Sequence, residues 1–198
     1  MEKNNYPWTG CGTDKEITGC RFSLSVMSND FISKILTAIQ DVSAETIWAS
    51  TDAISTTYRG KREHVMQAVR DVFVRVNDGR THVTMEATFS KGCPGDVDED
   101  SILSDRASFG VYVKNFDVLC KIAFYPLGVA SYMEHIAHVV NLAIERRIYH
   151  QSSHYATEIK GDVYEIFAFF DEIMKYGEAH LDHFVLQTTL SINSPTKQ

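Results

Sequence analysis

The chain has no long hydrophobic run, no excess of positive charge and few cysteines, and each of these absences excludes a class of protein. Its 198 residues contain no apolar stretch near the ~20 residues that a membrane-spanning helix needs. With 19 Lys and Arg against 26 Asp and Glu, the formal net charge is -7, which argues against nucleic acid as a partner and mildly favours a small cationic ligand. The N-terminal sequence MEKNNYPWTGCGTDKE lacks the basic start and apolar segment of a secretory signal. We therefore expect a cytoplasmic protein that does not insert into membranes.

The sequence also lacks the spacings that typically bind metals. No CxxC pair and no zinc-type arrangement of cysteine and histidine occurs among its four cysteines, Cys11, Cys20, Cys93 and Cys120. His135 and His138 are three residues apart on a predicted helix, but no third ligand accompanies them. The acidic residues between Asp96 and Asp105 lack the DxDxDG spacing of a calcium loop. We expect reduced thiols, no metal site and no cofactor.

An internal repeat is the most informative feature that the sequence does have. The segments HVTMEATFSKGCP, from His82, and HFVLQTTLSINSP, from His183, align with an offset of 101 residues. The same offset matches Thr56 with Thr157. Around Cys20 the offset is 100, which predicts a one-residue insertion in the turn after the first strand of the second copy. An offset shared over about 75 residues indicates two copies of one structural unit.

Each copy has the same order of hydrophobic periods. In the first copy, residues 20–26, 46–58 and 81–90 have strand-like patterns, whereas 30–41 and 61–77 have helical spacing of apolar residues. The first helix of each copy has an apolar face that includes Ile32 and Met133, respectively. The order strand–helix–strand–strand–helix–strand is the split βαβ, or ferredoxin-like, unit. We therefore predict an α+β fold of tandem ferredoxin-like βαββαβ repeats, with antiparallel sheets that carry helices on one face.

The predicted domain organisation has four segments. An N-terminal arm covers 1–18, the first repeat 19–91, an acidic linker 92–118 and the second repeat 119–195. The linker begins with glycine and proline, which break the preceding strand, and continues with a cluster of acidic residues. Each repeat leaves one face of its sheet open. Because the packing of open faces, within or between chains, would bury them, we expect a dimer.

No common catalytic motif is present. The sequence has no P-loop, no GxGxxG after a strand, no HExxH and no GxSxG. A catalytic carboxylate that was duplicated with the fold should remain as a matched pair, but Glu86 aligns with Gln187 and Asp52 with Ser153. The side chains that do match include His82 with His183, which suit either a ligand contact or a structural contact, and three pairs of hydroxyls. These hydroxyls are Thr56/Thr157, Thr88/Thr189 and Ser90/Ser191. Hydroxyls without a nearby base favour a binding protein over an enzyme.

A further pattern is carried by motifs that extend, in order and spacing, from about Cys11 to Pro195. They are Phe22-Ser23-Leu24, Asp30-Phe31-Ile32-Ser33, the stretch from Thr51 to Thr56 followed by Arg59-Gly60, the run from Thr88 to Asp96 that contains GCPGD, Tyr125-Pro126, His154-Tyr155-Ala156, Gly161-Asp162 and Asn193-Ser194-Pro195. Together they resemble the YkoF-type thiamin/hydroxymethylpyrimidine-binding proteins.

The resemblance implies a homodimer of chains with two ferredoxin-like, ACT-like repeats. Each repeat would have a cleft that binds one thiamin chiefly through its pyrimidine half, in the salvage of the pyrimidine precursor and without catalysis. An aminopyrimidine offers an amine donor beside a ring-nitrogen acceptor, which the C=O and N–H of a strand residue can match, and a hydroxyl can reach the other ring nitrogen. The expected site residues are Leu24 and Phe124 through their main chains, Thr56 and Thr157 through their hydroxyls, Ser25 and Tyr125 beside the ring, and Ser90 and Ser191 as further hydroxyls.

The two repeats differ at one of these positions. Tyr125-Pro126 of the second repeat aligns with Ser25-Val26 of the first, so the first cleft loses an aromatic wall and a rigid turn. We therefore expect unequal affinities, with the first site the weaker. Three other functions stay open: an ACT-like regulator that binds an amino acid or another small metabolite, an enzyme of thiamin pyrimidine metabolism, and a structural interaction module.

Overall fold

The computed structural model describes residues 17–40, 45–91, 104–106 and 114–196. The first half contains β1 (Thr18–Val26), α1 (Phe31–Gln40), β2 (Ile47–Thr51), β3 (Thr56–Gly60), α2 (Arg62–Val76) and β4 (Val83–Lys91). The second half contains β5 (Asp117–Leu127), α3 (Tyr132–Glu145), β6 (Tyr149–Ser153), β7 (Ala156–Asp162), α4 (Val163–His180) and β8 (His183–Ile192). Both halves have the predicted βαββαβ order, which confirms the α+β fold of two repeats. Most of the predicted N-terminal arm and most of the acidic linker, with Cys11 and Cys93, lie outside the described residues.

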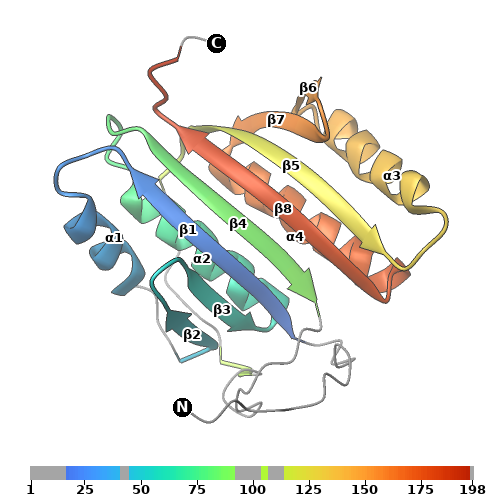
Figure 1. Ribbon diagram of the computed structural model, residues 1–198, viewed down its shortest axis with the longest axis horizontal. Helices are drawn as coiled ribbons and strands as arrows, with labels where there is room; N and C mark the ends of the chain where they lie inside the picture. The colour runs from blue at the N-terminus through green and yellow to red at the C-terminus, as the bar shows by residue number, and fades with distance from the viewer. Residues whose placement is uncertain (1–16, 41–44, 92–103, 107–113, 197–198) are drawn as a thin grey trace.

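The strands form a single antiparallel sheet with the order β2-β3-β1-β4-β8-β5-β7-β6. Figure 1 views this sheet from its open face, with α2 and α4 behind it and the short strands β2 and β6 at its two ends. Within each repeat the first strand lies at the centre, between the third and fourth strands of that repeat. Among the described residues, no helix is both long and apolar enough to cross a membrane.

The two repeats are joined edge to edge through β4 and β8. The register pairs Ala87 with Thr188, which are each other's equivalents at the offset of the repeat, so the two halves are related by a local twofold axis at this point. The buried Thr188 hydroxyl donates a hydrogen bond to the Ala87 carbonyl oxygen at 3.1 Å. Within the chain, therefore, the two sheets do not pack face to face. They continue each other, and their open faces form one surface.

The strand registers explain the change of offset that the sequence shows. Cys20 pairs with Tyr58 in the first repeat, and Cys120 pairs with Ile159 in the second. The first strands therefore correspond at an offset of 100 and the following elements at 101. The extra residue lies in the turn between β5 and α3, where Gly128 has a positive φ of 74° that favours glycine. The predicted insertion is confirmed.

One hydrophobic core lies between the sheet and the helices of both repeats. Alternate residues of β4, from Val83 to Phe89, are buried, whereas Glu86 and Thr88 are exposed on the open face. Phe89 of the first repeat packs on Phe170 of α4, with their ring centroids 6.0 Å apart. Each side chain therefore contributes to a core that crosses the boundary between the repeats.

The first helix of each repeat is less buried than its apolar pattern predicts. In α1 only Ala38 is buried, and in α3 only Val139 and Ala143. Ile32 and Met133, at equivalent positions near the helix starts, are 60% and 59% exposed. Helical spacing of apolar residues therefore does not lead to burial at these two positions. In the second repeat, Met133 lines a cleft.

Candidate functional site

The second repeat contains a cleft of about 780 Å³. It is formed by β5, by the inner side of α3 and by the hairpin of β6 and β7. The lining is mostly apolar and consists of Ile122, Ala123, Phe124, Tyr125, Met133, Ile136, Val139, Val140, Ser152, His154, Tyr155, Ala156 and Thr157. Binding sites for small molecules typically have this character, with apolar walls and a few polar groups that orient the ligand.

The main-chain N–H and C=O of Phe124 face the side of β5 on which β7 lies, but beyond the point where the pairing with β7 ends. The pairing of β5 with β7 ends at Ile122 and Thr157, so Phe124 lies beyond the end of this ladder. The Phe116 carbonyl accepts a hydrogen bond from the N–H of Val163, the residue that follows β7. This carbonyl therefore points toward the β7 side of β5. Because main-chain groups alternate in direction along a strand, the N–H and C=O of Phe124 have the same direction as those of Phe116. A ligand in the cleft can therefore reach one donor and one acceptor of a single residue.

Thr157 adds a hydroxyl to the same cleft. It is paired with Ile122 across the ladder, and Ile122 is buried on the helix side of the sheet. Since paired residues of an antiparallel ladder have their side chains on the same face, the Thr157 side chain also lies on the side of α3. The structure thus brings together two of the predicted groups, the Phe124 main chain and the Thr157 hydroxyl.

The first repeat has the corresponding groups in the corresponding places. The ladder between β1 and β3 ends at Phe22 and Thr56, so Leu24 lies beyond it as Phe124 does. The Met27 N–H donates to the His82 carbonyl at 3.0 Å, on the β4 side. Alternation along the strand therefore directs the N–H and C=O of Leu24 toward the β3 side. The Thr56 hydroxyl is only 3.0 Å from the Thr51 hydroxyl, and the pair can share one hydrogen bond and still offer another.

Ser25 and Tyr125 directly follow Leu24 and Phe124 in their strands. Their side chains therefore lie on the open face of the sheet, opposite the helices. Tyr125 is among the residues that line the cleft, yet its hydroxyl donates to Gln187 Oε1 at 3.4 Å. Gln187 is an exposed residue of β8 on the open face of the sheet. Because side chains alternate along a strand, a residue next to Phe124 cannot share its face. The Tyr125 ring therefore lies on the open face of the sheet and does not form the expected aromatic wall on the helix side, although the residue itself borders the cleft.

Ser90 and Ser191 are brought neither to the cleft of the second repeat nor to the corresponding groups of the first repeat. The Ser90 hydroxyl donates to the Phe184 carbonyl at 3.1 Å, and the Ser191 hydroxyl lies 3.2 Å from His82 Nε2. Both serines alternate with the buried residues of their strands and so lie on the open face, away from the helices. Their hydrogen bonds join β4 to β8, and His82 takes part in the same contact between the repeats.

The tip of the β6–β7 hairpin contributes residues to which the sequence analysis gave no role. His154 and Tyr155 line the cleft, and the Tyr155 side chain is fully exposed. Tyr155 also has a positive φ of 64°, which is uncommon for a residue other than glycine or asparagine. The sequence did contain a signal for these residues, because they directly precede Thr157, which is repeated as Thr56.

Two comparisons with known proteins agree with this arrangement. The model of the YKOF-related Family matches residues 17–96 and again residues 117–197, one match for each repeat. The chain is also 34% identical over 192 residues to the Bacillus subtilis (strain 168) protein named "Putative HMP/thiamine-binding protein YkoF", with 95% of this chain and 96% of that protein covered. The chain belongs to the YkoF-related family. Its two matched segments coincide with the two βαββαβ units of the sheet.

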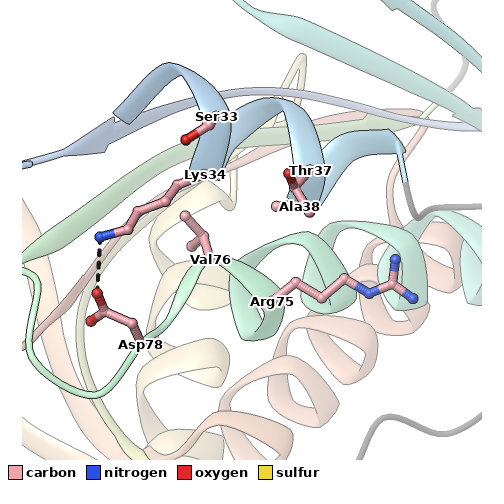
Figure 2. Close-up of a pocket in the computed structure, with 7 residues that line it drawn as sticks. All are labelled: Ser33, Lys34, Thr37, Ala38, Arg75, Val76 and Asp78. Atoms are coloured by element: carbon pink, nitrogen blue, oxygen red, sulfur yellow. Dashed lines mark hydrogen bonds and ion pairs between the residues drawn. The ribbon is translucent and has the colours of Figure 1, made fainter. Parts of the chain in front are cut away.

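A second hollow of this YkoF-related chain, of about 540 Å³, lies between α1 and α2 (Figure 2). Lys34 Nζ is 2.9 Å from Asp78 Oδ2 and 3.2 Å from the Thr81 hydroxyl. Hydrogen bonds from the Thr81 main chain and hydroxyl and from the Arg80 N–H hold the pKa of Asp78 well below its ordinary value, so this carboxylate stays ionised. The lysine and the carboxylate thus attach α1 to the loop after α2.

The equivalent junction in the second repeat of this family member is filled by rings. His135 and Tyr176 occupy the positions of Lys34 and Arg75, and His135 Nδ1 is 2.8 Å from the Tyr176 hydroxyl. The His138 ring stacks on Tyr176 with centroids 4.0 Å apart. The two histidines therefore take part in the packing of α3 against α4. Among the described residues, no cluster of three potential metal ligands occurs.

Proposed function

We propose that this protein binds thiamin or its hydroxymethylpyrimidine part without transforming it, with one cleft in each repeat, and that it serves the salvage of the thiamin precursor. The observation that carries the proposal is the pairing of a strand-edge main chain with a hydroxyl in an apolar cleft. In the second repeat these groups belong to Phe124 and Thr157. The printed name of the Bacillus subtilis relative supports the choice of ligand.

The groups at Phe124 match the hydrogen-bonding edge of an aminopyrimidine. The exocyclic amine donates and the adjacent ring nitrogen accepts, whereas the Phe124 C=O accepts and its N–H donates. The second ring nitrogen needs a donor, which the Thr157 hydroxyl supplies. Each such bond contributes only about 1 kcal/mol net, but a buried acceptor left without a partner costs about 1–3 kcal/mol. The cleft should therefore select its ligand chiefly by rejecting analogues that lack one of these groups.

The lining of the cleft supports binding without catalysis. The thirteen described residues that line it include no lysine, arginine, aspartate or glutamate, and His154 is the one imidazole among them. General acid–base or nucleophilic chemistry needs a reactive group with a partner that activates or orients it. A flat heteroaromatic ring suits this apolar cleft, whose volume is within the ordinary range for sites of small molecules.

Calorimetric titration with hydroxymethylpyrimidine, thiamin and a panel of amino acids tests this function. We expect heat from both pyrimidine ligands, a stoichiometry of two per chain and unequal affinities for the two clefts. Heat from an amino acid with none from the pyrimidines would instead identify an amino-acid regulator. Mass spectrometry of thiamin after incubation with the protein, with and without ATP and a divalent metal, should detect no product. A turned-over product would contradict binding without transformation.

We also propose that two chains form a homodimer through the open face of the sheet. Support comes from the extent of this face, which runs across both repeats and carries Leu119, Val185 and Thr189, all partly buried within the single chain. In sedimentation experiments the parent protein should behave as a dimer. Thr88→Arg, at an exposed position in the middle of this face, should shift it to a monomer, because burial of an unpaired charge is costly. Thr37→Arg, on the exposed side of α1, is the matched control and should leave the dimer intact.

A cytoplasmic location completes the proposal. Cys20 and Cys120 are free thiols, as a reducing compartment would keep them. Burial raises the pKa of both thiols above the ordinary value, so they stay protonated and inert inside the core.

A further inference from the structure

Exposed apolar side chains mark the rim of the cleft in the second repeat. Tyr155, at the tip of the β6–β7 hairpin, is fully exposed, and Met133, at the start of α3, is 59% exposed. Both residues line the cleft. Two large apolar side chains at the opening of a cleft are placed where they can contact a ligand bound in it.

The first repeat has exposed apolar side chains at the same two positions. Ile54, at the tip of the β2–β3 hairpin, is 78% exposed, and Ile32, at the start of α1, is 60% exposed. The feature is therefore duplicated with the fold, although its chemistry differs. The tip of the second repeat presents an aromatic ring, whereas the tip of the first presents an aliphatic side chain.

The two hairpin tips also differ in the charged side chain that lies beside them. In the first repeat the Arg21 guanidinium contacts the tip, with Nη2 2.7 Å from Asp52 Oδ2 and Nε donating to the Ser55 hydroxyl. The equivalent of Arg21 in the second repeat is Lys121, which lies 3.5 Å from Glu158 Oε1 instead. At the second tip, therefore, an exposed aromatic ring replaces Ile54, and a lysine that contacts Glu158 replaces the arginine that contacts the first tip.

We infer that Tyr155 makes the second cleft selective for a ligand that carries a positively charged aromatic ring, and that the first cleft lacks this selectivity. This inference rests on the proposed function, since thiamin joins a neutral pyrimidine to a cationic thiazolium. No carboxylate is among the described residues that line the cleft, so a cation there has no ion-pair partner among them. The negative face of the Tyr155 ring, at the rim, can attract it instead. With the pyrimidine at Phe124 and Thr157, the thiazolium is the part left for the rim.

Thiamin and its uncharged thiophene isostere, which differ in ring charge alone, provide the test. Methyl NMR can follow each cleft separately, with Met133 as the reporter for the second and Ile32 for the first. In the parent protein, the second cleft should bind thiamin about two- to fivefold more tightly than the isostere, the range expected for a cation over an exposed ring. Tyr155→Phe should keep this ratio and Tyr155→Leu should abolish it. Ile54→Tyr combined with Arg21→Gln, which removes the neighbouring guanidinium, should create a ratio above one in the first cleft.

Each result decides the inference. If Tyr155→Leu weakens thiamin and the isostere by the same factor, Tyr155 is only an apolar cover and the inference is wrong. An unchanged ratio in Tyr155→Leu overturns it as well. If the parent protein binds neither compound nor hydroxymethylpyrimidine, the proposed function fails and this inference fails with it. Binding of hydroxymethylpyrimidine together with equal affinities for thiamin and the isostere overturns the inference alone.

Discussion

Replacement of Thr157 by valine is expected to weaken the binding of hydroxymethylpyrimidine in the second cleft by about five- to 150-fold, without affecting the first cleft. Valine keeps the shape of threonine but cannot donate a hydrogen bond. The ring nitrogen that the hydroxyl serves would then be buried without a partner, and the loss of about 1–3 kcal/mol gives this range. Calorimetry on the variant should show one high-affinity site fewer than on the parent protein.

Two further variants show whether the hydroxyl is responsible. Thr157→Ser keeps the donor and should retain most of the affinity. Thr56→Val should have the opposite pattern, with a weakened first cleft and an unchanged second cleft. The Thr56 effect should be the smaller one, because its hydroxyl also lies 3.0 Å from the Thr51 hydroxyl. If both valine variants bind two ligands like the parent, the clefts have been placed incorrectly.

Gly177→Val is expected to reduce the free energy of unfolding by about 3 kcal/mol. Gly177 is a buried residue of α4, and a Cβ at this position would lie 2.5–2.7 Å from three atoms of the Phe184 ring. Phe184 is itself fully buried, so the ring cannot move aside without disturbing the core. Urea unfolding followed by circular dichroism measures the effect.

The first repeat provides the control for this prediction. Its equivalents of Gly177 and Phe184 are Val76 and Val83, so the same space is filled by two residues of intermediate size. Phe184→Val alone should cost about 2–4 kcal/mol because it leaves a cavity. The double variant should be more stable than the sum of the two changes predicts, since each change relieves the defect of the other. Strictly additive effects would show that the two side chains do not share this space.

The sequence alone predicts the repeated unit well, because its physical signals are local. The alternation of Val83, Met85, Ala87 and Phe89 requires a strand with one buried face, and the structure buries these four side chains. The change of offset between Cys20 and Thr56 correctly predicts an insertion in the turn of the second copy. The edge-to-edge joining of β4 and β8 could not be predicted in this way. It depends on main-chain groups, which every sequence of this length possesses, rather than on a side-chain pattern.

The candidate site is predicted in part, for a related reason. Phe124 and Thr157 flank the end of a ladder, and both the repeat and the family resemblance indicate these positions. Ser90 alternates with buried residues, and this alternation already placed it on the polar side, away from the helices. The position of Tyr155 beside the cleft was not predicted: the sequence places it just before the repeated Thr157, but its full exposure is visible only in the structure.

The continuous ladder between β4 and β8 also limits how the two halves of this protein can be used. A fragment ending after β4 would present a row of unpaired N–H and C=O groups nine residues long. Such an edge invites association with other copies and aggregation. The two repeats therefore depend on each other, because each covers the strand edge that the other would expose.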